Sequence, residues 1–167
     1  ISGSGGDCFD IRKSINLGTL KFVNNTIFDG MRTFFRIDAN ANIKITDFVF
    51  ENNTVKSIST MNDSNNRGIF AIRVATNMTL KKNLFLWMDG GKETGDYCQL
   101  FQNNGNTVVP TLTASGNYAY AQGNDFFAKV DAATAGFTVL DADPCFNSKG
   151  NFFQLENGTF GEGFAQM

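Results

Sequence analysis

The chain has 167 residues, the size of one domain, with 18% charged residues and a net charge of −2. This charge argues against nucleic acid as the main partner, because nucleic acid favours a basic face. The sequence contains no histidine, so it excludes His-based catalytic triads, histidine metal ligands and the commonest general base.

Short segments along the whole chain alternate apolar and polar residues with a period of two, the pattern of half-buried β-strands. In chain order they are residues 9–11, 20–22, 35–37, 43–45, 48–50, 72–74, 78–80, 101–103, 112–114, 128–130, 137–139 and 153–155. The 18 Phe residues, against 3 Tyr and 1 Trp, indicate a dry interior. The 17 Gly residues and the frequent Asn residues suit many tight corners. The sequence therefore predicts an all-β protein of short strands.

Four of these strands share a tail in which an Asn falls five residues after the first apolar position. The asparagines are Asn25, Asn53, Asn83 and Asn117, with separations of 28, 30 and 34 residues. Repeats of this length predict a solenoid, in which each coil climbs about 5 Å and like residues stack. We expect the four asparagines to form a hydrogen-bonded ladder at one corner.

One register stays open. Residues 42–45 also align with 77–80, which would place 48–50 on a different face of the coil. Either choice gives four or five irregular rungs. The fold expected is a right-handed, single-stranded parallel β-helix with a C-terminal cap.

A second series of strands places one polar residue between two inward-facing ones in each repeat. The resulting column is Asp10, Arg36, Arg73, Gln102 and Lys129. Stacked Arg36 and Arg73 would form a positive strip able to clamp uronic or sulfated sugars. The alternative is an ordinary solvated strand surface. Trp87 is a further candidate for stacking on sugar, or else packs beside the core.

The chain is expected to form a single domain, with rungs over 8–131 and a C-terminal cap over 132–167. Segments 57–68 and 89–96 are expected to be exposed loops. The N-terminal end has no obvious cap and the chain starts without Met, so we expect a C-terminal fragment of a larger protein whose upstream domain is a partner. No apolar run is long enough to span a membrane.

Metal and thiol chemistry have little support in the sequence. Cys8, Cys98 and Cys145 are far apart and form no CxxC motif, so they are interpreted as buried apolar residues. Asp29 and Asp89 each precede a Gly, which is first a turn signal. No metal site and no cofactor are predicted.

With these rungs in view, the chain resembles the pectate-lyase-like (pectin-lyase-like) right-handed β-helix superfamily. More narrowly, it resembles uncharacterised C-terminal β-helix domains of surface proteins from polysaccharide-utilising gut bacteria. The resemblance rests on residues 50–55 and 80–85, and on a closing Asp143-Pro144-x-Phe146 followed by Gly150-x-Phe152-x-x-Leu155.

The resemblance implies export to the periplasm, the outer-membrane surface or the medium, and contact with complex carbohydrate. Three functions follow as hypotheses: a non-catalytic module that binds acidic polysaccharide, a polysaccharide lyase or glycoside hydrolase, and a structural spacer. Family lyases act by β-elimination, often with Ca²⁺. The missing histidine and the lack of a clear carboxylate cluster favour the non-catalytic module.

Overall fold

The computed structural model describes residues 7–30, 33–58, 68–86, 99–102, 106–120 and 124–141. It is an all-β structure with three parallel sheets. Sheet one contains β1 (Phe9–Ile11), β4 (Phe35–Ile37), β7 (Gly68–Ile72) and β10 (Gln99–Phe101). Sheet two contains β2 (Ile15–Val23), β5 (Ile43–Glu51), β8 (Asn77–Lys81) and β11 (Thr111–Ser115). Sheet three contains β3 (Thr26–Gly30), β6 (Thr54–Ile58), β9 (Leu84–Leu86), β12 (Asn117–Tyr120) and β13 (Phe137–Val139).

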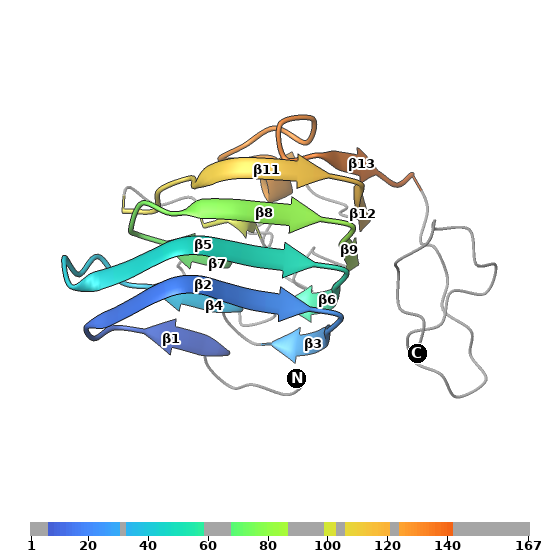
Figure 1. Ribbon diagram of the computed structural model, residues 1–167. Helices are drawn as coiled ribbons and strands as arrows, with labels where there is room; N and C mark the ends of the chain where they lie inside the picture. The colour runs from blue at the N-terminus through green and yellow to red at the C-terminus, as the bar shows by residue number, and fades with distance from the viewer. Residues whose placement is uncertain are drawn as a thin grey trace.

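The chain visits the three sheets in the same order, one, two, three, four times in succession. We call each passage a circuit: the first is β1–β3, the second β4–β6, the third β7–β9 and the fourth β10–β12. Figure 1 shows the circuits stacked, with sheet two on the near side. The 3₁₀ helix η1 (Asn124–Phe127) then packs against β10, and β13 adds a fifth strand to sheet three.

Sheet two has the register that the repeat predicts. Leu20, Phe48, Met78 and Leu112 occupy the same position on four neighbouring strands. Residues 48–50 therefore align with 78–80, and the alternative alignment of 42–45 with 77–80 is wrong, because Asn77 lies opposite Asp47 within β5.

Phenylalanines fill the interior as columns along the stack. Phe9, Phe35, Phe70 and Phe101 occupy one register position in sheet one. Neighbouring ring centroids lie 6.1 Å apart for Phe9 and Phe35, and 5.7 Å apart for Phe70 and Phe101. Phe48 of sheet two stacks on Phe35 from across the interior, at 4.7 Å and an interplanar angle of 21°. Burying each such ring contributes about 1.5–3 kcal/mol, so these columns are a main source of cohesion between circuits.

The corner between sheets two and three repeats the same backbone conformation in every circuit. One residue there has a positive φ, and the residue after it begins or precedes the next strand. The residues are Asn24 (58°), Asn52 (53°), Lys82 (52°) and Gly116 (64°), and Gly136 (64°) has the same conformation just before β13. Asn and Gly accept this left-handed region most readily, which explains why they recur at the corner.

The four predicted asparagines follow these corner residues and lie one above another. The backbone N–H and side-chain Nδ2 of each one donate to Oδ1 of the next, at 2.9–3.2 Å: Asn25 to Asn53, Asn53 to Asn83, Asn83 to Asn117. Nδ2 of Asn117 donates to the carbonyl of Ala135, and its N–H to that of Gly136. We call these four residues the Asn ladder, since it ties every circuit to the next.

Several predicted elements differ or lie elsewhere. Strand β7 ends at Ile72, so 72–74 is not a strand, and 128–130 forms no strand in this described stretch. Strand β10 is Gln99–Phe101 rather than 101–103. Within the expected cap at 132–167, β13 continues sheet three. Trp87, the loop at 89–96, most of the loop at 57–68, the closing motif at 143–155, Cys98 and Cys145 lie outside the described residues.

Candidate functional site

Arg36, the first member of the predicted basic strip, lies on β4 opposite Asp10 of β1. Its guanidinium contacts three carboxylates. The closest is Asp38, with Nη2 3.0 Å from Oδ1, followed by Asp7 at 3.6 Å and Asp10 at 3.9 Å. The positive charge of Arg36 is thus neutralised by neighbouring carboxylates.

Arg73 lies near Arg36 but not in the predicted column. Ala71 occupies the position opposite Arg36, and Arg73 follows β7, where its backbone N–H donates to the carbonyl of Ile37. Its Nη1 lies 3.1 Å from Oδ1 of Asp38, the oxygen that Arg36 also contacts. The two arginines therefore meet at a shared carboxylate instead of stacking.

The same cluster extends to Arg12, whose Nη2 lies 2.5 Å from Oδ2 of Asp10. The hydrogen bond and charge of Asp10 raise the pKa of the Arg12 guanidinium above its usual value. Three guanidinium groups here face three carboxylates, so the predicted positive strip is an ion-pair cluster that is neutral within itself. Sequence spacing did not place Asp7 and Asp38 in it.

The remaining predicted residues do not join this cluster. Gln102 is buried, with 6% of its surface exposed, and its backbone N–H donates to the carbonyl of Phe70. Lys129 is half-buried in the segment after η1 and belongs to no strand of sheet one. The structure thus brings Arg36 and Arg73 together, while Gln102 and Lys129 lie elsewhere.

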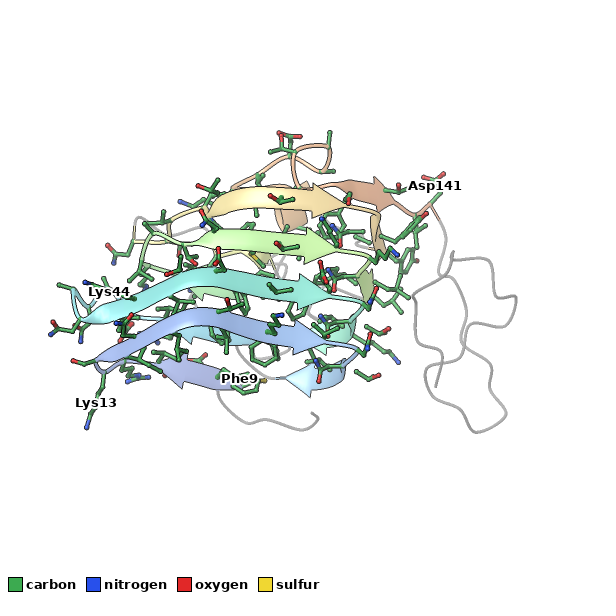
Figure 2. All side chains as sticks on the ribbon, viewed as in Figure 1. Phe9, Lys13, Lys44 and Asp141 are labelled. Carbon is green, nitrogen blue, oxygen red and sulfur yellow. The ribbon has the colours of Figure 1, made fainter. Side chains whose placement is uncertain are left out.

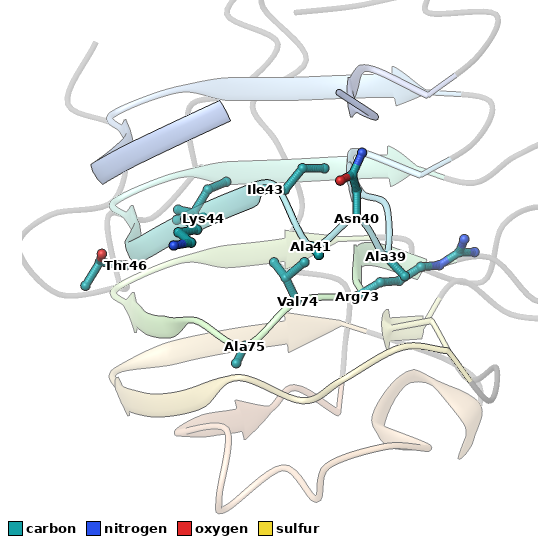
Figure 3. Close-up of a pocket in the computed structure, with 10 residues that line it drawn as sticks. Ala39, Asn40, Ala41, Ile43, Lys44, Thr46, Arg73, Val74 and Ala75 are labelled. Carbon is teal, nitrogen blue, oxygen red and sulfur yellow. The ribbon is translucent and has the colours of Figure 1, made fainter. Parts of the chain in front are cut away.

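A groove of about 530 Å³ opens beside the ion-pair cluster, between the first half of β5 and the segment that follows β7. Figure 3 shows its lining residues, which come from two consecutive circuits. They are Ala39, Asn40, Ala41, Ile43, Lys44, Ile45, Thr46, Arg73, Val74 and Ala75.

The groove exists because β5 is longer than the strand above it. Ile43–Ile45 pair with Ile15–Leu17 of β2, whereas pairing with β8 begins only at Asp47. On the side of the third circuit, these three residues thus face segment 73–76 rather than a described strand. The small side chains of Ala39, Ala41 and Ala75 keep the space between the two segments open.

Two cationic side chains lie at the margins of the groove: Lys44, and Arg73, which is paired with Asp38. Lys44 is exposed and has no carboxylate partner among the described residues, and Figure 2 shows it at the start of β5. Arg73 keeps 18% of its side-chain surface exposed, and its Nε is buried without a described hydrogen-bond partner. Lys44 was not predicted as a site residue, because an exposed lysine at the polar position of a strand has no distinguishing pattern.

Other kinds of site find no support in the described residues. They contain no group of three or more acidic or cysteine side chains placed to hold a metal ion, and none of their helices is long and apolar enough to cross a membrane. Comparisons of the chain with protein-family models, curated proteins and solved structures find no match.

Proposed function

We propose that the chain is a right-handed parallel β-helix of the pectin-lyase-like kind. Three sheets visited in constant order, stacked Phe columns and the Asn ladder support this proposal. In Figure 1 the strands of sheet two run from left to right on the near side while the chain climbs from β1 to β13, a right-handed sense. The resemblance of the rungs to that superfamily adds to this support.

We further propose that the chain is a non-catalytic module of a secreted or cell-surface bacterial protein and binds an acidic polysaccharide. The observation that carries this proposal is the open groove with Lys44 and Arg73 at its margins. An open groove suits a chain-like ligand, since it leaves both ends of the bound segment free to continue.

The chemistry of the lining matches a uronic or sulfated sugar. Lys44 offers a mobile point charge, and Arg73 offers a planar guanidinium that Asp38 holds in place. The methyl groups of Ala39, Ala41 and Val74 offer an apolar surface to the C–H face of a sugar ring. An exposed cation contributes about 0.2–1 kcal/mol to such a contact, so we expect weak, salt-sensitive binding.

Binding of polygalacturonate and of a sulfated glycan, measured by calorimetry on the parent chain and two variants, tests the proposal. Lys44→Ala should weaken binding about two- to fivefold, which corresponds to losing one exposed charge contact. Lys21→Ala is the matched control, because Lys21 is also exposed on sheet two but does not line the groove. Arg73→Lys keeps the charge and should weaken binding by removing the planar fork.

Several results would contradict the proposal. They are the absence of binding across a broad array of acidic glycans, equal binding by the parent and Lys44→Ala, and an equal loss in the Lys21→Ala control. The appearance of new reducing ends or unsaturated uronate during the incubation would instead indicate an enzyme.

A further inference from the structure

Among the described residues, the first circuit is the last layer at its end of the stack. Strands β1, β2 and β3 are each the terminal strand of their sheet, paired only with β4, β5 and β6 among the described residues. Open edges of this kind present unpaired backbone N–H and C=O groups to any strand that approaches.

The interior side chains of β1 and β2 are only half-buried, whereas their register partners one circuit above are at most 4% exposed. The half-buried residues are Phe9, Ile11, Ile15, Leu17, Leu20 and Phe22; their partners are Phe35, Ile37, Ile43, Ile45, Phe48 and Phe50. Figure 2 shows Phe9 at this edge. The edge therefore presents apolar surface that a further layer would bury.

The Asn ladder indicates which hydrogen-bonding groups that layer must provide. In each of its three steps, the lower asparagine donates two N–H groups to Oδ1 of the upper one. Asn25 is the lowest member, and its Oδ1 accepts no hydrogen bond from any described residue. The open end of the ladder is thus an acceptor that lacks the pair of donors every other step has.

We propose that the first-circuit edge binds a further parallel β circuit that carries an asparagine at the corner, below Asn25. Its backbone N–H and Nδ2 complete the ladder at Asn25 Oδ1, while its apolar side chains cover Phe9 and Phe22. This inference concerns an interaction surface and is independent of glycan binding in the groove.

The ladder argues against a second copy of this chain as the partner. An end-to-end pair with both first circuits in contact would set one Asn25 Oδ1 against another, two acceptors without a donor. A head-to-tail pair would bring Phe137 to the edge, because Phe137 takes the ladder position opposite Asn117 at the other described end. Phe137 has no side-chain amide to donate.

A fusion tests the proposal: a copy of residues 33–58 is joined in front of Ile1, so that the Gly- and Ser-rich residues 2–6 serve as linker. We expect a higher urea midpoint than for the parent chain and slower hydrogen exchange in β1, β2 and β3. A matched fusion whose added copy carries Ala in place of its ladder asparagine should lose most of both effects. A third fusion with the added copy scrambled should behave as the parent.

Two results would overturn the proposal. One is that the asparagine and alanine fusions protect the first circuit equally against hydrogen exchange, or that neither fusion protects it. The other is concentration-dependent dimerisation of the parent chain in analytical ultracentrifugation that Asn25→Ala abolishes, because it would assign the edge to a second copy.

Discussion

Asparagine suits the ladder because one short side chain offers an acceptor and a donor beside its own backbone N–H. Asn83 uses all of these groups: it donates to Asn117 Oδ1 and to the carbonyl of Phe50, and it accepts two bonds from Asn53. Since Asn83 is fully buried, its loss would leave these partners with unsatisfied hydrogen-bonding groups, and no water could take the place of its side chain.

Asn83→Ala should therefore lower the free energy of unfolding by roughly 2–4 kcal/mol. Asn25→Ala is the internal comparison, because Asn25 is only half-buried and its Oδ1 accepts no hydrogen bond from the described residues; its cost should be about 1 kcal/mol. Urea unfolding followed by circular dichroism measures both. Equal losses for the two variants would contradict a ladder whose strength depends on burial.

The corner glycines offer a second matched pair. Both Gly116 and Gly136 have φ of 64°, so Gly116→Ala should cost about 1–2 kcal/mol from conformation alone. A Cβ at Gly136 would lie 2.6 Å from the backbone of Ala114 and Ser115, whereas one at Gly116 meets only a Lys82 side-chain carbon at 3.7 Å. Gly136→Ala should be the more destabilising by a further 1–3 kcal/mol. Thermal unfolding of the two variants decides this order.

Asp131 provides a prediction on pH. Its carboxylate accepts from the backbone N–H of Thr134 at 2.8 Å and from the Thr134 hydroxyl at 2.7 Å, and these bonds lower the pKa of Asp131 below its ordinary value of 3.8. Because the folded-state pKa is the lower one, the stabilisation is complete above pH 3.8 and is lost as the pH falls through the folded value.

An NMR titration of the Asp131 carboxyl group checks this direction. Thr134→Ala should raise the pKa toward 3.8, while Thr134→Ser keeps the hydroxyl and should retain most of the shift. A parent chain whose Asp131 titrates at its ordinary value would refute the prediction.

At the level of elements, the sequence predicted the strands best where apolar and polar residues alternate along them. Sheet two alternates because its outer face is solvated, so the register of β2, β5, β8 and β11 was predicted from the pattern. In sheet one every residue of β7 is buried, so the outward-facing positions of this strand hold Ile69 and Ala71 instead of polar residues. The alternation at 72–74 was the clearer pattern, so Arg73 was predicted to lie opposite Arg36. That position is taken by Ala71, two residues earlier in the chain.

The candidate site was harder to predict than the fold for a related reason. The groove depends on where β8 begins relative to β5, which is set by the different lengths of the two connections. Loop residues such as Asp38 and Ala39 have no repeating neighbour from which their positions follow. The sequence pattern predicted Arg36 and Arg73 but not the carboxylate between them.

The ion-pair cluster at the β4–β5 connection yields the element-scale prediction. Asp38→Asn removes the charge that Arg36 and Arg73 share and should cost about 1 kcal/mol at low salt, less at high salt. Asp47→Asn is the control, since Asp47 accepts from the neutral Asn77 and forms no ion pair among the described residues. Urea midpoints at two salt concentrations separate the variants, and an equal salt response would contradict the prediction.

At the scale of the whole molecule, burial changes along the stack. The interior side chains are half-buried on β1 and β2 of the first circuit and almost fully buried in the second and third circuits. Local stability follows buried apolar contact, so we expect opening to begin at β1–β3. Hydrogen exchange by mass spectrometry should show faster exchange there than in β7–β9; uniform exchange across the circuits would contradict a graded stack.

The Asn ladder also gives the stack an electrical direction. All three steps have N–H groups pointing from the lower circuit and Oδ1 atoms from the upper, so the amide dipoles are aligned and polarise one another. The negative pole lies at Asn25, and the positive pole meets the carbonyls of Ala135 and Gly136. Reversing a single asparagine amide would set two like poles face to face. The ladder can therefore form only if all four amides have the same orientation.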